Sequence, residues 1–443
     1  MKKYVHFILL ILLPVLTHAQ QEVRTYYDQE EEILKEVYFV NKNGPDIIEG
    51  KYLKYHPNTT IAVEGSFKDG YKDGTFKEYY PSGKLQRIVS YKNGKKEGPV
   101  KVYSETGQLI QAGSFINNEL ADSLYTHYTD GSLRSRGYFV NGKPQGTLLE
   151  YYPSGKIKRK ITYKEGFQTG ITETYYEDGT LMTEGNYLKG ILNGYYKTYF
   201  PNGQLETESQ MAEGEKTGVF KTYNMQGQLL LKGMYMNGQL HGENIGYYPN
   251  GNMEHNYTYN AGKKVGTGYA YYSNGKPKAK TELNKDQTEE KISKYDTLGQ
   301  LTSVENYLNG KPHGEWKQFH ANGKIKTVEY YDQDRLNGLR TTYHENGIKA
   351  SEQLFKFGMK YETGKTYYPD GTLASETPYH ANKIHGIYKS YHENGQLKEE
   401  GEYVTNRKVN EWQLFNEKGE LMRVEIYKNN QLIDTKTAPF DAN

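Results

Sequence analysis

The feature that most constrains this chain is an internal repeat of 24 residues. With position 0 set at Gly50, sixteen repeats follow one another through residues 50–434 without an insertion or deletion. Self-similarity at a fixed short period is the signature of a repeat architecture, in which each repeat packs mainly against its neighbours. Residues are therefore described below by their position within a repeat as well as by their number.

Two positions indicate the local structure of a repeat. Position 5 is an aromatic residue or His in every repeat, and position 9 is Gly in every repeat except the first, which has Thr59. In Pro201-Asn202-Gly203, the proline sets φ for the first turn residue and the glycine accepts the left-handed conformation that closes a hairpin. Each repeat is therefore predicted to be two short strands joined by a tight turn. The predicted turn glycines include Gly83, Gly107, Gly155, Gly203, Gly251, Gly323 and Gly395, and the predicted packed rings include Tyr79, Tyr151, Tyr199 and Tyr367.

Three further positions predict a core and a second turn. Position 11 is Leu, Ile or Met in fourteen repeats, and position 17 is aromatic in all but two. The two positions are an even number of residues apart, so in a regular strand their side chains share one face, which we expect to be the core. Position 20 is Gly in ten repeats and Asn or Asp in six, including Asp286. Because these residues tolerate positive φ, position 20 is predicted to be left-handed.

The repeats predict an all-β fold, an elongated antiparallel ribbon or solenoid of about sixteen β-hairpins. One hairpin buries too little surface to be stable, so the repeats must stack through their strands. Thirty-two strands about 4.8 Å apart would form a flat sheet on the order of 150 Å long. Residues 20–49 follow the pattern with altered spacing and are predicted to be a degenerate N-terminal repeat or cap, and residues 435–443 to be a C-terminal tail.

Residues 1–19 are typical of a cleavable signal peptide. Two lysines precede an apolar run from Val5 to Leu16, and Ala19 offers a cleavage site. The run is shorter than the roughly 20 residues that a transmembrane helix needs, and no later stretch approaches that length. The chain has no Cys, which excludes a lipid-modified N-terminal Cys and disulfides. We therefore expect a secreted, periplasmic or outer-surface protein that is neither a lipoprotein nor a transmembrane protein.

Charge argues against nucleic acid as a partner. Removal of Lys2 and Lys3 with the signal peptide lowers the count of basic side chains from 56 to 54, which equals the count of acidic ones. A nucleic-acid-binding protein normally has a basic excess or a basic stripe. The 14% aromatic content also argues against a disordered chain.

The repeats resemble the MORN-repeat variant of bacterial proteins, whose commonest label is a YwqK-type antitoxin component. The pattern G-x-[YFW]-x-x-Y-[YH]-x-[ND]-G-x-L is met closely by residues 170–194 and 386–403. At position 0, Gly is replaced in four repeats, by Asp122, Glu290, Glu362 and Asn410. The resemblance implies a protein-binding or membrane-surface role without catalysis, and in this family a proposed antitoxin role.

The candidate binding face is position 6, which carries Tyr or His in most repeats. Neighbouring side chains of a strand point to opposite faces, so in a pair such as Tyr151-Tyr152 one ring should pack and the other be displayed. Trp316 and Trp412, both at position 2, are expected to share one environment. The candidate binding face consists of Tyr80, Tyr128, Tyr152, Tyr176, Tyr248, Tyr272, His320, His344, Tyr368 and His392.

The sequence has no pattern that favours a catalytic site or a metal site. His320 and His344 would lie about 10 Å apart across two strands, so a shared metal ion is not expected. Carboxylates recur beside lysines as solvated partners, and no hydrolase, metalloprotease, phosphate-loop or dinucleotide motif is present. We expect no enzyme activity, catalytic residue, metal or cofactor.

Three functions remain open at this stage. The leading hypothesis is an extracytoplasmic scaffold that binds a protein or envelope partner along its ribbon. The alternatives are a carbohydrate or cell-wall binding module, which the exposed tyrosines would suit, and an antitoxin of the YwqK type. Export of the chain would disfavour the antitoxin, because an antitoxin acts on a cytoplasmic toxin.

Overall fold

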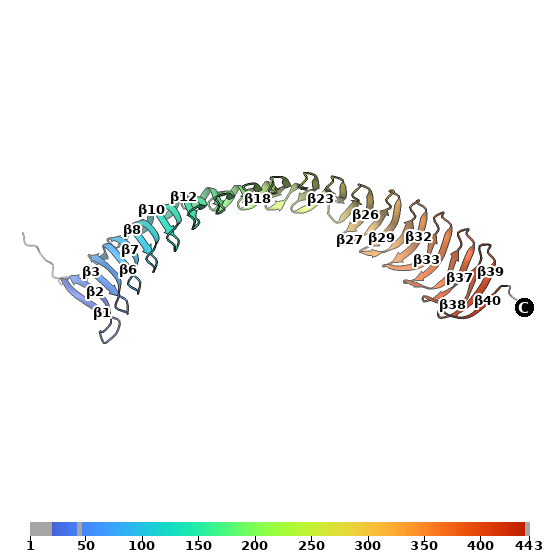
Figure 1. Cartoon of the computed structure of the whole chain (residues 1–443), viewed down its shortest axis with the longest axis horizontal. Coiled ribbons are helices and arrows are strands. Elements are labelled where there is room, and N and C mark those ends of the chain that lie inside the picture. The colour runs from blue at the N-terminus through green and yellow to red at the C-terminus, as the bar shows by residue number, and fades with distance from the viewer. Residues whose placement is uncertain (1–19, 42–46, 439–443) are drawn as a thin grey trace, which may run out of the picture. The chain divides into compact units, whose positions relative to one another are not determined.

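The computed structural model describes residues 20–41 and 47–438, so the predicted signal peptide lies outside the described residues. The chain divides into two compact halves, Met1–Glu215 and Lys216–Asn443. In each half the regular elements of the described residues are β-strands, and they follow one another along the sheet in chain order (Figure 1). In the described part of the chain, no helix is long and apolar enough to cross a membrane.

The N-terminal half contains the first seventeen strands. They are β1 Gln20–Tyr26, β2 Leu34–Asn41, β3 Ile48–Tyr55, β4 Ile61–Lys68, β5 Tyr71–Lys72, β6 Gly74–Tyr79, β7 Leu85–Lys92, β8 Lys95–Tyr103, β9 Leu109–Ile116, β10 Glu119–His127, β11 Leu133–Val140, β12 Lys143–Tyr151, β13 Ile157–Lys164, β14 Phe167–Tyr175, β15 Leu181–Leu188, β16 Ile191–Tyr199 and β17 Leu205–Ala212.

The remaining strands belong to the C-terminal half, apart from the first residue of β18. They are β18 Glu215–Tyr223, β19 Leu229–Met236, β20 Gln239–Leu240, β21 Gly242–Tyr247, β22 Met253–Asn260, β23 Lys263–Tyr271, β24 Pro277–Leu283, β25 Glu289–Tyr295, β26 Leu301–Leu308, β27 Lys311–Pro312, β28 Gly314–Phe319, β29 Ile325–Asp332, β30 Arg335–Leu336, β31 Gly338–Tyr343, β32 Lys349–Lys356, β33 Met359–Tyr367, β34 Leu373–His380, β35 Lys383–Ile384, β36 Gly386–Tyr391, β37 Leu397–Val404, β38 Arg407–Phe415, β39 Leu421–Lys428 and β40 Gln431–Thr437.

The turn inside each repeat, here called the front turn, follows from its Pro-Asn/Ser-Gly chemistry. In the second repeat, the Gly83 amide donates to the Tyr80 carbonyl and the Tyr80 amide donates to the Lys84 carbonyl, each at 2.8 Å. Gly83 has a φ of +82°. This is a type I turn closed by a left-handed residue, the usual three-residue hairpin connection. The other predicted turn glycines lie in the same conformation, with φ values from +81° to +89° at Gly107, Gly155, Gly203, Gly251, Gly323 and Gly395.

The turn between repeats, here called the back turn, is a two-residue hairpin followed by a β-bulge. Asn93 and Gly94 have φ values of +49° and +77°, as a type I′ turn requires. The strand register then shifts, and Gly98 at position 0 has a φ of +92°. The bulge explains why position 0 is usually Gly, and where Glu362 replaces Gly it is left-handed as well, with a φ of +63°.

One back turn differs, and there the prediction for Asp286 is wrong. Between β24 and β25 the loop closes through the Gln287 amide to the Asn284 carbonyl, and Gln287 is the left-handed residue, with a φ of +59°. The β24–β25 pairing has no register shift. This loop is longer than the other back turns and contains the extra residue that forms a β-bulge elsewhere. Neither Asp286 nor Glu290 therefore has a positive φ.

A second register shift, next to the front turn, shows that the predicted core was partly wrong. The residues that flank this turn pair as position 5 with position 11, but the next pair is position 4 with position 13, as in Tyr343↔Lys349 and Thr342↔Ser351. Position 12 is therefore unpaired and the alternation is interrupted. The Lys349 side chain reaches Glu352, at position 14, on the face opposite position 17. Positions 11 and 17 do not share a face, contrary to the even-spacing argument.

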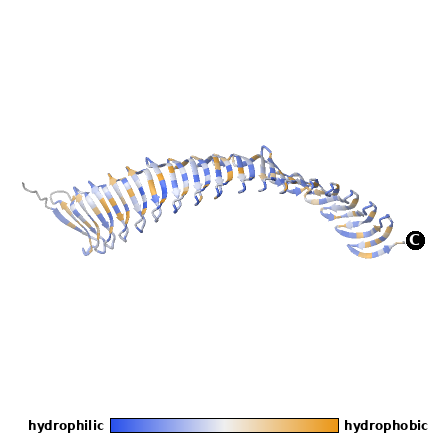
Figure 2. Ribbon diagram, turned by 45° about the horizontal axis from the view of Figure 1, so that its top comes forward, coloured by the Kyte–Doolittle hydropathy of each residue, from blue (hydrophilic) through white to orange (hydrophobic). Residues whose placement is uncertain are grey.

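The packed side of the sheet, here called the aromatic face, carries positions 2, 15 and 17. The ring at position 2 contacts the ring at position 17 of the preceding repeat and of its own repeat, as in Tyr403–Trp412 and Trp412–Tyr427, with centroids 5.0 and 6.2 Å apart. Phe76 is 1% exposed and Trp412 is fully buried. The opposite side, the charged face, carries positions 1, 3, 5, 14, 16 and 18. Apolar and polar segments alternate along the strands of both halves (Figure 2).

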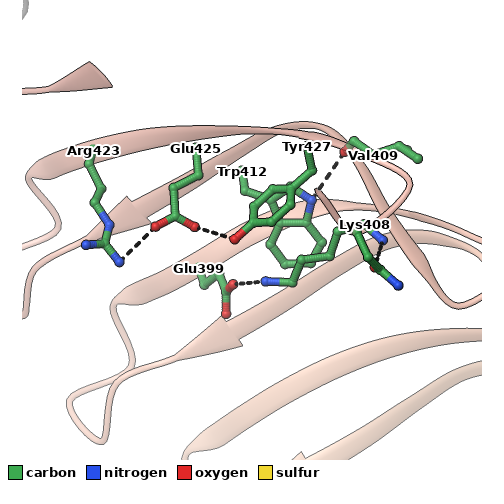
Figure 3. A network of polar contacts seen from close by, with 8 residues as sticks. Glu399, Lys408, Val409, Trp412, Arg423, Glu425 and Tyr427 are labelled. Carbon is green, nitrogen blue, oxygen red and sulfur yellow. Dashed lines mark hydrogen bonds and ion pairs between the residues drawn. The ribbon is translucent and has the colours of Figure 1, made fainter. Parts of the chain in front are cut away.

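Glycines at position 15 let these rings lie against the backbone. An added Cβ at Gly401 would come within 2.1 Å of the Trp412 ring, and one at Gly65 within 2.5 Å of the Phe76 ring. Figure 3 shows the surroundings of Trp412: Lys408 lies over the ring at 3.7 Å and bonds Glu399, while Glu425 joins Arg423 to Tyr427. Around Trp412 the core is thus a row of rings, with Gly401 beneath the indole and ion pairs at the sides.

Candidate binding surfaces

The Tyr and His residues at position 6 join their repeat to the next one. In all ten candidate residues the side chain donates a hydrogen bond to the position 5 carbonyl of the following repeat, 23 residues on, at 2.7–3.0 Å. Tyr152, for example, donates to the Tyr175 carbonyl. In His320, His344 and His392 the bond requires the proton on Nε2, because a carbonyl only accepts. All ten rings are half-buried, so each has its polar atom in the scaffold and part of its ring exposed.

Four repeats have a short polar residue at position 6 that caps its own front turn. Asn224 Oδ1 accepts from the Gln226 and Gln228 amides, and Asp296 and Asn416 act in the same way. Ser104 Oγ accepts from the Gln108 amide. These side chains are too short to reach the next repeat, so position 6 either bonds the next repeat or caps its own turn, except at Phe200, which has no polar atom.

Asparagine at position 8 adds a second bond between neighbouring front turns. Its Oδ1 accepts the amide of position 10, and its Nδ2 donates to the position 7 carbonyl of the next repeat. At Asn394 the Nδ2 bond runs to the Glu417 carbonyl at 2.6 Å. The same inter-repeat bond is made by Asn58, Asn250, Asn274, Asn322 and Asn346. This ladder of bonds was not predicted, although an Asn or Asp residue before the turn glycine in most repeats could have indicated it.

Basic side chains also lie on this edge of the sheet. The edge is here called the front rim and consists of positions 6–12 of all repeats. Lys276 and Lys324, at position 10, donate to the position 8 carbonyl of the next repeat. At position 12, Arg134, Lys158 and Lys278 lie over the rings of Tyr128, Tyr152 and Tyr272, 5.5–5.9 Å from the ring centroids. Cations placed over aromatic faces are held in position while their charge stays in water.

The position 5 tyrosines lie on the charged face and contact carboxylates. Tyr79 donates to Glu64 and Tyr367 to Glu352, at 2.7 and 2.8 Å. Burial, together with the adjacent carboxylate, raises the pKa of both phenols to about 12. These rings are half-buried, as are Tyr151 and Tyr199, and so they form the flank of the sheet, while the fully buried rings of Phe76 and Trp412 lie on the aromatic face.

The two tryptophans lie in different surroundings. Trp412 is fully buried and its Nε1 donates to the Val409 carbonyl. Trp316 is only half-buried, and its Nε1 donates to the Asn306 carbonyl. Trp316 packs between Tyr307 and Tyr331. The expectation of one shared environment is therefore wrong, because residues at position 15 and the back turns differ between the two repeats.

The irregular back turn forms a cleft of about 440 Å³ on the C-terminal half. Its lining includes Asn284, Glu290, Tyr307 and His313. Within the described residues, no group of three or more His, Asp or Glu side chains is arranged to hold a metal ion. His320 and His344 each direct Nε2 to a backbone carbonyl.

Comparison with known proteins gives one family match. Ten segments match the model of the MORN repeat variant, namely residues 72–93, 96–117, 144–165, 168–189, 192–212, 240–261, 312–333, 336–357, 363–381 and 384–405. No curated protein matches the chain.

Similar solved structures include a TcdB2–TccC3 complex without its hypervariable C-terminal region, at 11% identity, covering 94% of this chain and 27% of that chain, with a TM-score of 0.15. They also include a TcdB2–TccC3–Cdc42 complex, at 12% identity, covering 93% of this chain and 30% of that chain, with a TM-score of 0.13. A third is a Tc holotoxin pore of Photorhabdus luminescens, at 11% identity, covering 89% and 27% of the two chains, with a TM-score of 0.13. The chain spans less than a third of each of these proteins' chains.

Proposed function

The chain is a protein of MORN-variant repeats, and from that premise we propose that it is an exported, non-catalytic scaffold that binds a protein or cell-envelope partner along its front rim. Export rests on the sequence of residues 1–19. Binding without catalysis rests on the repetition of the same side chains along the rim, since catalysis needs one unique constellation in a cleft.

The observation that carries the proposal is the series of bonds from position 6. Each one fixes an aromatic ring against the next repeat while leaving part of that ring in solvent. A surface held in one conformation loses little entropy on binding, so modest contacts at many repeats can add up to useful affinity. In some repeats a cation at position 12, such as Arg134, Lys158 or Lys278, adds local positive charge to this surface.

The test is a quantitative pull-down from envelope fractions of the native host. A front-rim variant with Arg134, Lys158 and Lys278 changed to Ala keeps the inter-repeat bonds and removes the exposed cations. The matched control changes Lys263, Lys311 and Lys383, all at position 21 on back turns, to Ala. We expect the wild type and the control to recover the same partner and the front-rim variant to lose most of it. Recovery of no specific partner would contradict the proposal.

Fractionation of the host tests the location separately. We expect a form cleaved after Ala19 outside the cytoplasm. An uncleaved cytoplasmic form would contradict export and would favour the antitoxin role.

A carbohydrate ligand is a second candidate, favoured by one observation. The half-buried rings of Tyr80, Tyr176, Tyr248 and Tyr368 have no cation over them among the described residues, so part of each ring is free to stack on a sugar. Retention on glycan or peptidoglycan columns that is lost when Tyr80, Tyr176 and Tyr248 are changed to Ala would support this ligand over a protein.

A further inference from the structure

The charged face of the N-terminal half carries an unpartnered apolar patch at its back turns. Positions 18 and 21 flank each back turn, pair with one another and point to this face, as in Leu188↔Ile191. Leu188 and Ile191 are each 51% exposed, and they form the only back turn of the sixteen with apolar residues at both positions. Phe167, at 54% exposed, and Ile171, at 46%, extend the patch.

The patch is continuous because consecutive back turns lie side by side. The Gly190 amide donates to the Gln168 carbonyl and the Gly214 amide to the Leu192 carbonyl. An added Cβ at Gly214 would lie 3.4 Å from Ile191, which places the next back turn against this side chain. A contiguous apolar area of this kind on an exposed sheet marks an interaction site.

Charge on either side of the patch has opposite sign. Residues 132–164 contain eight basic and one acidic side chain, a net charge of +7. Residues 192–215, which follow the patch, contain four acidic side chains and one basic side chain, a net charge of −3. The chain as a whole is nearly neutral, so this separation is a local feature.

The exposed charges at the back turns follow the same division. Lys143 and Lys164 lie before the patch and form no ion pair within the described residues. Glu213 and Glu215 lie after it, are exposed, and also form no ion pair within that part of the chain. The lysines and glutamates are therefore available to an outside partner.

The order of these residues is self-complementary. Leu188 lies on β15, midway between Lys143 on β12 and Glu215 on β18. A two-fold axis parallel to β15 and between two facing sheets reverses the strand order, so it places Lys143 of one copy over Glu215 of the other. The same operation places Phe167 on β14 over Ile191 on β16, and Leu188 over its own symmetry mate. Such an isologous contact closes after two copies.

We propose that the charged face around Leu188 is a dimer interface, and that its partner is a second copy of this chain in the opposite strand order. The five strand spacings from β12 to β17, of about 4.8 Å each, and eight residues of about 3.4 Å give a footprint of roughly 24 by 27 Å, or about 650 Å² per copy. Specific interfaces bury roughly 600–1,000 Å² per partner. The apolar centre with charged flanks also matches the usual anatomy of such interfaces.

Sedimentation velocity of the whole protein over a concentration series tests the proposal. We expect a monomer–dimer equilibrium in the wild type. Changing Leu188 to Asp, at an exposed position that the fold does not bury, should raise the dimer Kd by at least about 30-fold, the effect of a central hot-spot residue.

Two charge variants test the strand order. Lys143→Glu with Lys164→Glu makes both flanks acidic, and Glu213→Lys with Glu215→Lys makes both basic. Each variant alone should be a monomer, and a mixture of the two should form a heterodimer at low salt. The control, Lys311→Glu with Lys383→Glu, makes the same change at position 21 of the C-terminal half and should leave the dimer intact.

A wild type that is monomeric at every concentration would overturn the proposal, and the partner of the patch would then be a different protein. A dimer that survives the Leu188 change would overturn it as well. If both charge variants are monomers and their mixture does not associate, the antiparallel arrangement is wrong. None of these results depends on the front-rim partner, because the substituted residues lie at or beside the back turns, at the opposite end of the strands from the front rim.

Discussion

At the scale of the residue, the core depends on glycines beneath aromatic rings. Phe76 and Trp412 lie against Gly65 and Gly401, each at position 15 of the preceding repeat. The aromatic residues at position 17 were expected in the core, but position 2, where the residue varies from Trp to Gly, was not. A ring at position 2 follows the glycines Gly65, Gly185 and Gly401 at position 15 of the preceding repeat, whereas Leu124, Leu148 and Asn244 follow Gly113, Gly137 and Gly233.

Changing Gly401 to Ala should destabilise the C-terminal half by about 1–3 kcal/mol, since the new methyl group would displace a buried ring. Gly137→Ala is the matched control, because its nearest neighbour is the flexible end of Leu148 at 3.2 Å. Hydrogen exchange of the flanking strands measures both. Equal effects of the two changes would contradict this account of the core.

The Tyr367–Glu352 pair should make stability fall at high pH. The pKa of Tyr367 is raised from 10 to about 12, so folding favours the neutral phenol. Its contribution is fully present below pH 10 and is lost as the pH rises to about 12. The difference in unfolding free energy between wild type and Tyr367→Phe should therefore shrink across this range. Urea unfolding at pH values on either side of it provides the measurement, and a constant difference would disprove the coupling.

At the scale of the element, position 0 shows how the back turn controls the backbone. The bulge that follows a two-residue turn requires a left-handed residue, and Glu362 has that conformation at a cost of about 1–2 kcal/mol for a non-glycine residue. Glu290 occupies the same position after the longer loop and has no positive φ. The sequence showed both as departures from Gly and could not separate them, because the loop between Asn284 and Glu289 determines which one is strained.

This difference predicts opposite results for one substitution. Glu362→Gly should stabilise the protein by up to about 1 kcal/mol through relief of the left-handed strain. Glu290→Gly should destabilise it by about 0.5–1 kcal/mol, because a flexible residue replaces one in an extended strand. Chemical denaturation of each single variant decides the matter, and the same sign for both would refute the bulge argument.

The asparagine ladder allows a reciprocal test. Asn394→Asp removes the donor to the Glu417 carbonyl but keeps the acceptor for the Gln396 amide, and should cost about 0.5–1.5 kcal/mol. Asp370 occupies the same position with only the acceptor bond, so Asp370→Asn should stabilise the protein. Thermal unfolding of both variants is the readout. If both variants were less stable than the wild type, or if neither differed from it in stability, the asparagine bonds between repeats would contribute nothing.

At the scale of the whole molecule, the 24-residue period was enough to predict an all-β hairpin repeat. The hydrogen-bonded strand order in each half confirms that fold class. The candidate binding role of position 6 stays a prediction. Its bonds to the next repeat could not be predicted, since they depend on how far the following front turn lies from Tyr152 or His320. Residues 1–19 lie outside the described part of the chain, and export also stays a prediction.

Because each strand contacts only the strands beside it, we expect the protein to unfold gradually. Each strand in the described residues bonds the strands next to it in sequence, so segments can open without the rest. We expect a denaturant slope well below that of a two-state protein of 443 residues. Coincident transitions by circular dichroism and tryptophan fluorescence, with a full-sized slope, would contradict this expectation.

The position 6 bonds all run from one repeat to the following one, and this gives the chain a direction. Each repeat presents its position 5 carbonyl to the repeat before it, and the repeats with Tyr or His at position 6 present a donor to the repeat after them, so copies of such a 24-residue segment fit one another. A gene that encodes repeats joined by these hydrogen bonds can gain or lose whole 24-residue repeats by recombination without disturbing the repeats that remain. An insertion of any other length would leave donors opposite side chains, so the lineage should vary in steps of 24 residues.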